Sequence, residues 1–289
     1  MVEEDPPYSC QLAVILARDA PKGVILRRGP TNWVQLILWH TDSDTFEEGQ
    51  WFRGRIYEHM SDLSPDGSLF LYLARKAKTL QREQSEYTHK WTAISKPPYF
   101  TALALWPVGE AWDGGGIFTD RRTIWLCHHS ARAHPRHRPR GLKVSASFEP
   151  EAFRQRDRYN RWQLIQEGRF YFEKAAGFPL GAKGITIKPY IWQKDHPDQR
   201  YQLVIESYRE PNFKTEFLRY VVDTSNDERT LLEDITWVDW DQQGRLVYSK
   251  GGQLFASETT EEPLNVRAIA DFYTNQPKRV LPPRWATRW

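Results

Sequence analysis

Imidazole, thiol and guanidinium groups are concentrated in residues 127–140, which read CHHSARAHPRHRPR. The segment holds half of the 8 histidines of the chain, and no acidic residue occurs from Arg121 to Phe148. Imidazole and thiolate are ligands that zinc prefers. A closed zinc site also needs rigid geometry, which a loop rich in Pro and Arg does not supply, and the arginines repel a cation. We therefore expect no metal site; its weak candidate ligands are Cys127, His128, His129, His134 and His137.

The arginines of the same segment have the chemistry to bind anions. Guanidinium groups pair with phosphate or carboxylate through two parallel hydrogen bonds, and Trp125 could add stacking. A nucleic-acid-binding protein also needs an extended basic face, which a net charge of only +3 does not predict. Acidic side chains of a peptide would meet the same arginines. The sequence thus predicts a basic, His- and Arg-rich surface loop over residues 127–143.

Exposed Arg, Trp and Tyr are the residue types enriched at interaction hot spots. The tryptophans have a competing interpretation, because large aromatic side chains more often pack inside a protein than contact a partner. The predicted partner-binding residues are Arg53, Arg55, Tyr57, Tyr99, Trp106, Trp112, Arg132, Arg136 and Arg138.

Signatures of catalysis are missing from the sequence. There is no phosphate loop, no His-Glu-x-x-His, no Gly-x-Ser-x-Gly and no dinucleotide fingerprint. The carboxylates of residues 42–48 lack the turn glycine and terminal Glu of an EF-hand. We expect no cofactor, and the absence of these motifs weakens the case for an enzyme without removing it.

The element that organises the chain is a turn followed by a strand. Residues 64–67, Ser-Pro-Asp-Gly, form a turn signature, since proline fixes φ where the turn starts and glycine adopts a positive φ at little cost. Beyond it, Leu69 and Leu71 alternate with the side chains of residues 68, 70 and 72, the period of two that a sheet requires. The stretch predicts the corner of a β-hairpin.

A second copy of this corner occurs far along the chain. Asp239 stands five residues before Gly244, just as Asp62 stands five before Gly67, and a Leu follows two residues after each glycine. The copies lie 177 residues apart, close to four repeats of the roughly 40–45 residues usual for propeller blades. The pattern resembles the Ser-Pro-Asp-Gly repeat of TolB-type and related WD-like propellers, in which it joins two neighbouring strands of a blade.

This resemblance implies an all-β fold. We expect residues 1–289 to form a single bacterial-type β-propeller of five or six irregular four-stranded blades. A short helix could form near residues 151–165, which are rich in Glu, Arg and Gln. The prolines and tryptophans of residues 270–289 exclude a regular central strand, so we expect this tail to close the ring on the first blade.

The cellular location is predicted from weaker features of the sequence. Cys10 and Cys127 lie far apart and form no metal or redox motif, so we expect reduced thiols. The acidic start lacks the features of a signal peptide, and no run approaches the roughly 18 apolar residues of a membrane span. These features predict a soluble, cytoplasmic protein of unknown oligomeric state.

The leading functional hypothesis is a non-catalytic propeller scaffold that binds a protein or peptide partner. The alternative is a hydrolase or lyase acting on a glycan or peptide in the central channel. The third hypothesis is nucleic-acid binding through the Arg- and His-rich loop. A propeller hosts many functions, so the fold alone does not decide between them.

Overall fold

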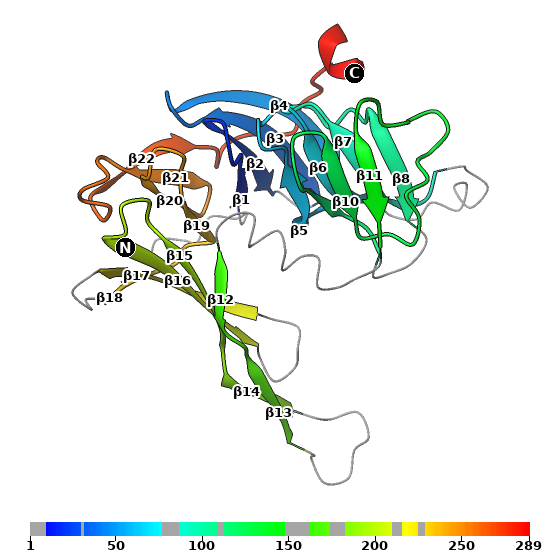
Figure 1. Cartoon of the computed structure of the whole chain (residues 1–289). Helices are drawn as coiled ribbons and strands as arrows, with labels where there is room; N and C mark the ends of the chain where they lie inside the picture. Colours follow the sequence, from blue (N-terminus) through cyan, green and yellow to red (C-terminus); the bar gives the residue numbers. More distant parts are fainter. Residues whose placement is uncertain are drawn as a thin grey trace.

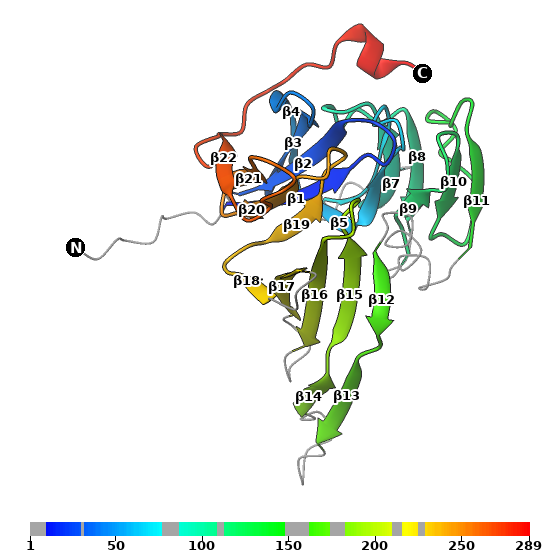
Figure 2. The same cartoon turned by 60° about the vertical axis from the view of Figure 1, so that its left-hand side comes forward.

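The computed structural model describes residues 10–29, 32–76, 87–108, 113–147, 162–173, 183–209, 216–224 and 229–289. They form an all-β propeller with five blades, which confirms the predicted fold. Blades 1, 2 and 5 have four strands, blade 3 has three and blade 4 has five. Figures 1 and 2 show the blades in chain order, with blade 4 and the β13–β14 hairpin extending away from the rest.

The first two blades are antiparallel sheets of consecutive strands. Blade 1 contains β1 (Gln11–Leu16), β2 (Lys22–Arg28), β3 (Trp33–His40) and β4 (Thr45–Arg53). Blade 2 contains β5 (Arg55–Leu63), β6 (Phe70–Arg75), β7 (Lys90–Ser95) and β8 (Ala104–Val108).

The remaining blades are less uniform. Blade 3 contains β9 (Gly116–Phe118), β10 (Thr123–Leu126) and β11 (Lys143–Ala146), with β11 parallel to β10. Blade 4 contains β12 (Gln163–Gln166), β15 (Tyr190–Asp195), β16 (Tyr201–Arg209), β17 (Glu216–Thr224) and β18 (Arg229–Leu232). The separate hairpin is β13 (Arg169–Glu173) with β14 (Lys183–Lys188). Blade 5 contains β19 (Trp237–Trp240), β20 (Leu246–Lys250), β21 (Gln253–Ser257) and β22 (Val266–Asp271).

The apolar core is divided among the joints between blades, because successive side chains of a strand point to opposite faces of its sheet. In β2, Val24 and Leu26 face the joint of blades 1 and 2, while Ile25 faces the joint of blades 5 and 1. Further clusters fill the joints between blades 2 and 3 and between blades 4 and 5. Among the described residues no such cluster joins blades 3 and 4.

The two corners found in the sequence have the same structure. Gly67 and Gly244 have φ of 69° and 80°, and each donates its backbone N–H to the carbonyl three residues earlier, at 2.8 and 3.0 Å. Both corners join the first and second strands of a blade. A third copy, His196 to Gln199 in blade 4, has φ of 62° at Gln199 and the same 2.8 Å hydrogen bond.

These corners contact one another across the joints. His196 hydrogen-bonds the Gly244 carbonyl at 2.7 Å, and the Gln242 amide donates to the Ala17 carbonyl in the first corner of blade 1 at 2.6 Å. The Asp19 N–H of that same corner donates to the Pro65 carbonyl at 2.8 Å. A continuous line of hairpin corners thus connects blades 4, 5, 1 and 2.

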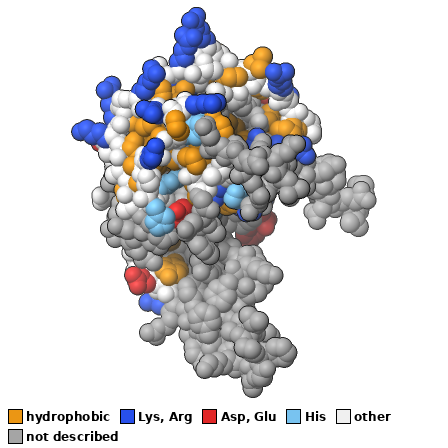
Figure 3. Space-filling view, turned by 90° about the vertical axis from the view of Figure 1, so that its right-hand side faces the viewer, with side chains coloured by type: hydrophobic (Ala, Val, Ile, Leu, Met, Phe, Trp, Pro, Cys, Tyr) orange, Lys and Arg blue, Asp and Glu red, His pale blue; other side chains and the backbone are white. Residues whose placement is uncertain are grey.

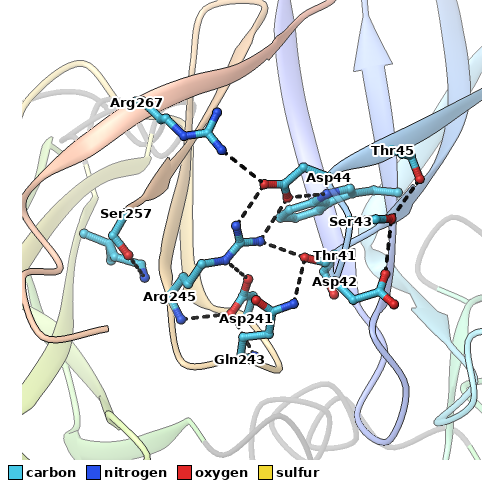
Figure 4. Close-up of polar contacts among 12 residues, drawn as sticks. Thr41, Asp42, Ser43, Asp44, Thr45, Asp241, Gln243, Arg245, Ser257 and Arg267 are labelled. Carbon is cyan, nitrogen blue, oxygen red and sulfur yellow. Dashed lines mark hydrogen bonds and ion pairs between the residues drawn. The ribbon is translucent and has the colours of Figure 1, made fainter. Parts of the chain in front are cut away.

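An ionic network joins the two ends of the chain at blades 5 and 1 (Figure 4). The Arg245 guanidinium makes two hydrogen bonds to Asp44, at 2.8 and 2.9 Å, and one to Asp241 at 2.8 Å. It also donates to the Thr41 carbonyl at 2.8 Å. The Asp241 side chain has no solvent exposure, so Arg245 supplies the charge that compensates a buried carboxylate.

The expected short helix is only partly within the described residues. Residues 151–161 of the expected helix lie outside the described residues, and the expectation is wrong for residues 163–165, which belong to strand β12. The tail contains the end of β22 and the 3₁₀ turn η2 (Arg284–Thr287). Within the part of the chain that the structure describes, no helix is long and apolar enough to cross a membrane.

Candidate functional site

The basic loop lies along the edge of blade 2. The His134 N–H donates to the Leu105 carbonyl of β8 at 2.8 Å, and the Leu105 N–H donates to the His137 carbonyl at 3.1 Å. The indole N–H of Trp106 reaches the Ala131 carbonyl at 3.0 Å. The loop backbone is therefore fixed against an outer strand, which presents its arginines on a firm support.

Side chains of the loop divide into two groups. His134 is buried and stacks on Tyr87 with ring centroids 4.3 Å apart, and His137 hydrogen-bonds the Tyr87 hydroxyl at 3.1 Å. The histidines therefore anchor the loop. The arginines are exposed to solvent, where a partner can reach them; they are Arg132, Arg136, Arg138 and Arg140.

The C-terminal tail reaches the same surface. It runs from blade 5 across blades 1 and 2. Three side chains donate hydrogen bonds to its backbone carbonyls: Arg27 to Tyr273 at 2.7 Å, Gln50 to Val280 at 3.1 Å and Lys96 to Arg288 at 2.7 Å. At its end the Trp289 indole donates to the Arg138 carbonyl at 3.1 Å. The tail and the loop are thus in direct contact.

We define the loop-tail face as residues 127–143 together with Tyr99 and residues 281–289. The tail contributes two exposed apolar side chains, Leu281 (69% exposed) and Trp285 (52% exposed), and two exposed arginines, Arg284 and Arg288. Figure 3 views the molecule from the side of blades 2 and 3, where Lys and Arg side chains surround an area of hydrophobic side chains.

Charge is strongly segregated along the chain. Residues 121–147 and 272–289 contain eleven Lys and Arg and no acidic residue, although the whole chain has a net charge of only +3. The remainder of the chain is therefore net acidic. The structure brings the two basic segments together, so the loop-tail face has the extended positive character that the net charge did not predict.

A second polar cluster lies between blades 2 and 3. The Lys90 ammonium donates to the Asp113 carbonyl at 2.5 Å, and the Thr92 hydroxyl lies 2.8 Å from His128 Nε2. Lys90, Thr92, Asp113 and His128 are all buried. His129, more than half exposed, lies 3.4 Å from the Asp113 carboxylate. This cluster places four ionisable groups at one joint of the propeller.

Burial of the His128 imidazole lowers its pKa to about 4, with smaller contributions from the nearby Lys90 and His129 charges, while Asp113 acts in the opposite direction. His128 is therefore neutral at pH 7. The Thr92 hydroxyl oxygen accepts the Gly115 N–H at 2.7 Å and lies 2.8 Å from His128 Nε2, so a hydrogen bond holds the neutral imidazole in its buried site.

We expect the stability of the protein to fall as the pH drops from 6.5 to 4. An unfolded His takes up its proton near pH 6.5, whereas folded His128 does so only near pH 4, so the unfolded state binds more protons within this window. The loss from this group is about 2 kcal/mol between pH 7 and pH 4.5. Urea unfolding at both pH values measures it, and His128→Gln should reduce the difference by that amount. An unchanged difference in the variant would contradict the assignment.

No model of a known protein family matches the chain, and no curated protein matches it. The function therefore has to be argued from the surfaces described above.

The structure divides the partner-binding residues predicted from the sequence. Tyr99, Arg132, Arg136 and Arg138 belong to the loop-tail face, where the Tyr99 ring meets that of Trp285 at 5.6 Å. Trp106 has no exposed surface, so its side chain fills the joint of blades 2 and 3. Trp112 lies outside the described residues. Arg53, Arg55 and Tyr57 are located where β4 leads into β5, away from the corner of blade 2.

The weak metal candidates are also separated. Cys127 and His128 are buried near Lys90, whereas the His134 ring stacks on Tyr87 and the His137 ring meets Tyr87 edge to face. Across the described residues no group of three His, Cys, Asp or Glu side chains could share a metal ion.

Sequence reasoning missed the contribution of the tail and of Lys90. The acid-free composition of residues 272–289 was a usable signal for the tail. No sequence signal pairs Lys90 with Asp113, since that contact depends on how blades 2 and 3 pack. A pocket of about 520 Å³ beside the loop, lined by aromatic residues including Phe52, Tyr72 and Trp91, was likewise absent from the prediction.

Proposed function

We propose that the protein is a non-catalytic propeller scaffold that binds an acidic segment of a partner protein on the loop-tail face. The observation that carries the proposal is the convergence of two acid-free segments that expose six arginines together with Leu281 and Trp285. Arginine forms strong paired hydrogen bonds with carboxylates, and a large apolar side chain among polar neighbours is typical of an interaction hot spot.

The balance of side chains favours a protein over a nucleic acid. Binding of single strands relies on several aromatic rings on which successive bases stack. Among the described residues of the loop-tail face, Trp285 is the one Phe, Tyr or Trp side chain with more than half of its surface exposed. A peptide with acidic and apolar residues matches both the arginines and the Leu281–Trp285 pair. A cytoplasmic location is part of this proposal, supported by the two buried free thiols.

A direct binding measurement tests the proposal. A fluorescent peptide of alternating Glu and Leu residues should bind the wild-type protein in about 0.15 M salt, and Arg132→Glu/Arg136→Glu/Arg138→Glu should weaken binding at least about 30-fold, because each reversed charge repels the ligand. These arginine side chains are exposed, so folding should be retained. Reversal of Arg53, which is exposed at the end of β4 in blade 1, is the matched control.

Three results would overturn the proposal. They are equal affinity of the wild-type protein and the triple variant, equal loss in the Arg53 control, and tighter binding of an oligothymidine of the same charge. The last result would assign the surface to nucleic acid.

A further inference from the structure

A pocket of about 520 Å³ lies at the joint of blades 1 and 2, beside the basic loop. Five aromatic rings line it: Phe52 of β4, Tyr72 of β6, Trp91 of β7, and Tyr87 and Phe100 from the connections on either side of β7. Phe52, Tyr72 and Phe100 also belong to the apolar core of this joint. Because these rings are packed into the core, the pocket has walls of fixed shape.

The volume of the pocket is larger than one side chain of a partner protein would fill. About 150 Å³ is enough for a benzene molecule inside a protein, so the pocket has room for two or three fused rings. A single Phe or Leu of a partner would leave most of the volume empty, and the walls would lose the contacts that stabilise a packed interface. The volume lies in the range of about 300–1,000 Å³ that is usual for small-molecule sites.

Polar side chains of the lining already make contacts within the protein. The Tyr72 hydroxyl donates to the Phe100 carbonyl at 2.5 Å, and the Thr88 hydroxyl donates to the backbone carbonyl two residues later. The Lys76 ammonium lies over the Phe52 ring, 5.3 Å from its centroid. The pocket therefore selects a ligand by apolar contact and shape more than by charge or by hydrogen bonds.

Several of the lining rings stand at steep angles to one another. The Phe52 and Trp91 rings meet at 76° with centroids 6.0 Å apart, and the Tyr72 and Phe100 rings meet at 72° with centroids 5.3 Å apart. A flat aromatic ligand against such walls stacks on one ring and meets another edge to face, the two arrangements that aromatic pairs prefer. A saturated ring system of the same size makes neither contact.

We propose that this pocket binds a small neutral molecule with two or three fused aromatic rings. The volume sets the size of the ligand, the engaged polar groups favour a ligand without charge, and the angles between the rings favour an aromatic ligand over an aliphatic one. The site is distinct from the loop-tail face and does not depend on the proposed scaffold function.

Isothermal titration calorimetry of the whole chain with 2-naphthol at neutral pH tests the site. One molecule should bind per chain with a Kd on the order of 10 µM, a value typical of a well-fitting ligand of this size. Decahydro-2-naphthol, the saturated counterpart, should bind at least about 5-fold more weakly, because it lacks the contacts between rings.

Variants locate the bound probe. Ala102 also lines the pocket, so Ala102→Phe places a phenyl group in the volume, and Trp91→Leu removes a ring of the wall. Each should weaken 2-naphthol binding at least about 10-fold. Trp125→Leu, which replaces another half-buried tryptophan of a strand, and Trp285→Ala on the loop-tail face are the matched controls and should bind like the wild type. Circular dichroism checks the fold of each variant, and if one pocket variant does not fold, the other decides.

Four results would overturn the proposal. The wild type does not bind 2-naphthol; decahydro-2-naphthol binds with equal or higher affinity, as expected for a merely apolar void; the folded pocket variants bind like the wild type; or the loss is equally large in Trp125→Leu or Trp285→Ala, which would place the probe elsewhere.

Discussion

Arg245→Ala should lower the free energy of unfolding by about 3–5 kcal/mol, because it leaves the buried Asp241 carboxylate without its cation. The Arg245 side chain is 13% exposed and holds Asp44, Asp241 and the Thr41 carbonyl together. Asp44 and Thr41 belong to blade 1, whereas Asp241 and Arg245 belong to blade 5. The variant therefore loosens the joint at which the two ends of the chain meet. Urea unfolding measures the loss.

Arg267 provides a matched control at the same joint. Its guanidinium lies 3.9 Å from Asp44, but its side chain is 58% exposed, so Arg267→Ala should cost less than about 1 kcal/mol. In the double variant Arg245→Ala/Asp44→Ala, the two losses should fall short of additivity by about 1–3 kcal/mol, since both changes break the same contact. Equal effects of Arg245→Ala and Arg267→Ala would show that burial of the network does not stabilise the joint.

Gly115→Ala should cost about 4 kcal/mol, because a side chain there meets backbone that cannot move aside. Gly115 has a φ of +80°, and a Cβ atom would lie 2.3 Å from the Met60 carbonyl oxygen of β5. Backbone has no rotamer to change, so blade 3 has to move away from blade 2. The Gly115 N–H hydrogen bond to Thr92 and the packing around His128 would be lost with that movement.

Gly141→Ala separates the steric clash of an added Cβ atom from the backbone strain of a positive φ. Gly141 has a similar φ of +66°, but no atom lies within 4 Å of the point that a Cβ atom would occupy, so only the backbone strain applies. That strain costs about 1–2 kcal/mol. Thermal or urea unfolding of both variants should show a clear difference. Equal losses of stability in Gly115→Ala and Gly141→Ala would mean that blades 2 and 3 can move apart at no cost in the free energy of unfolding.

The sequence contained enough information for the architecture because turn chemistry is local. Gly67 and Gly244 mark corners that share a positive φ and the same backbone hydrogen bond. Because this conformation favours glycine, the two corners have similar sequences and were recognisable as copies. The third corner was missed as a copy because Gln199 occupies the positive-φ position, where glycine is the usual signal. Blade 3, with its short strands and one parallel pair, has no comparable signature.

The candidate sites were less predictable because they depend on register and packing. The basic loop was found from composition, but its support by β8 and its contact with Trp289 are long-range. The Lys90–Asp113 contact depends on how blades 2 and 3 pack, which no pattern in the sequence indicates.

Affinity purification of the whole chain from its native host, compared with Arg132→Glu/Arg136→Glu/Arg138→Glu, tests most directly whether the loop-tail face binds a partner protein. The account predicts that one protein co-elutes in stoichiometric amount with the wild type and with the Arg53→Glu control, and that it is absent from the triple variant. Co-elution of that protein with all three forms, or of nucleic acid in its place, would contradict the account.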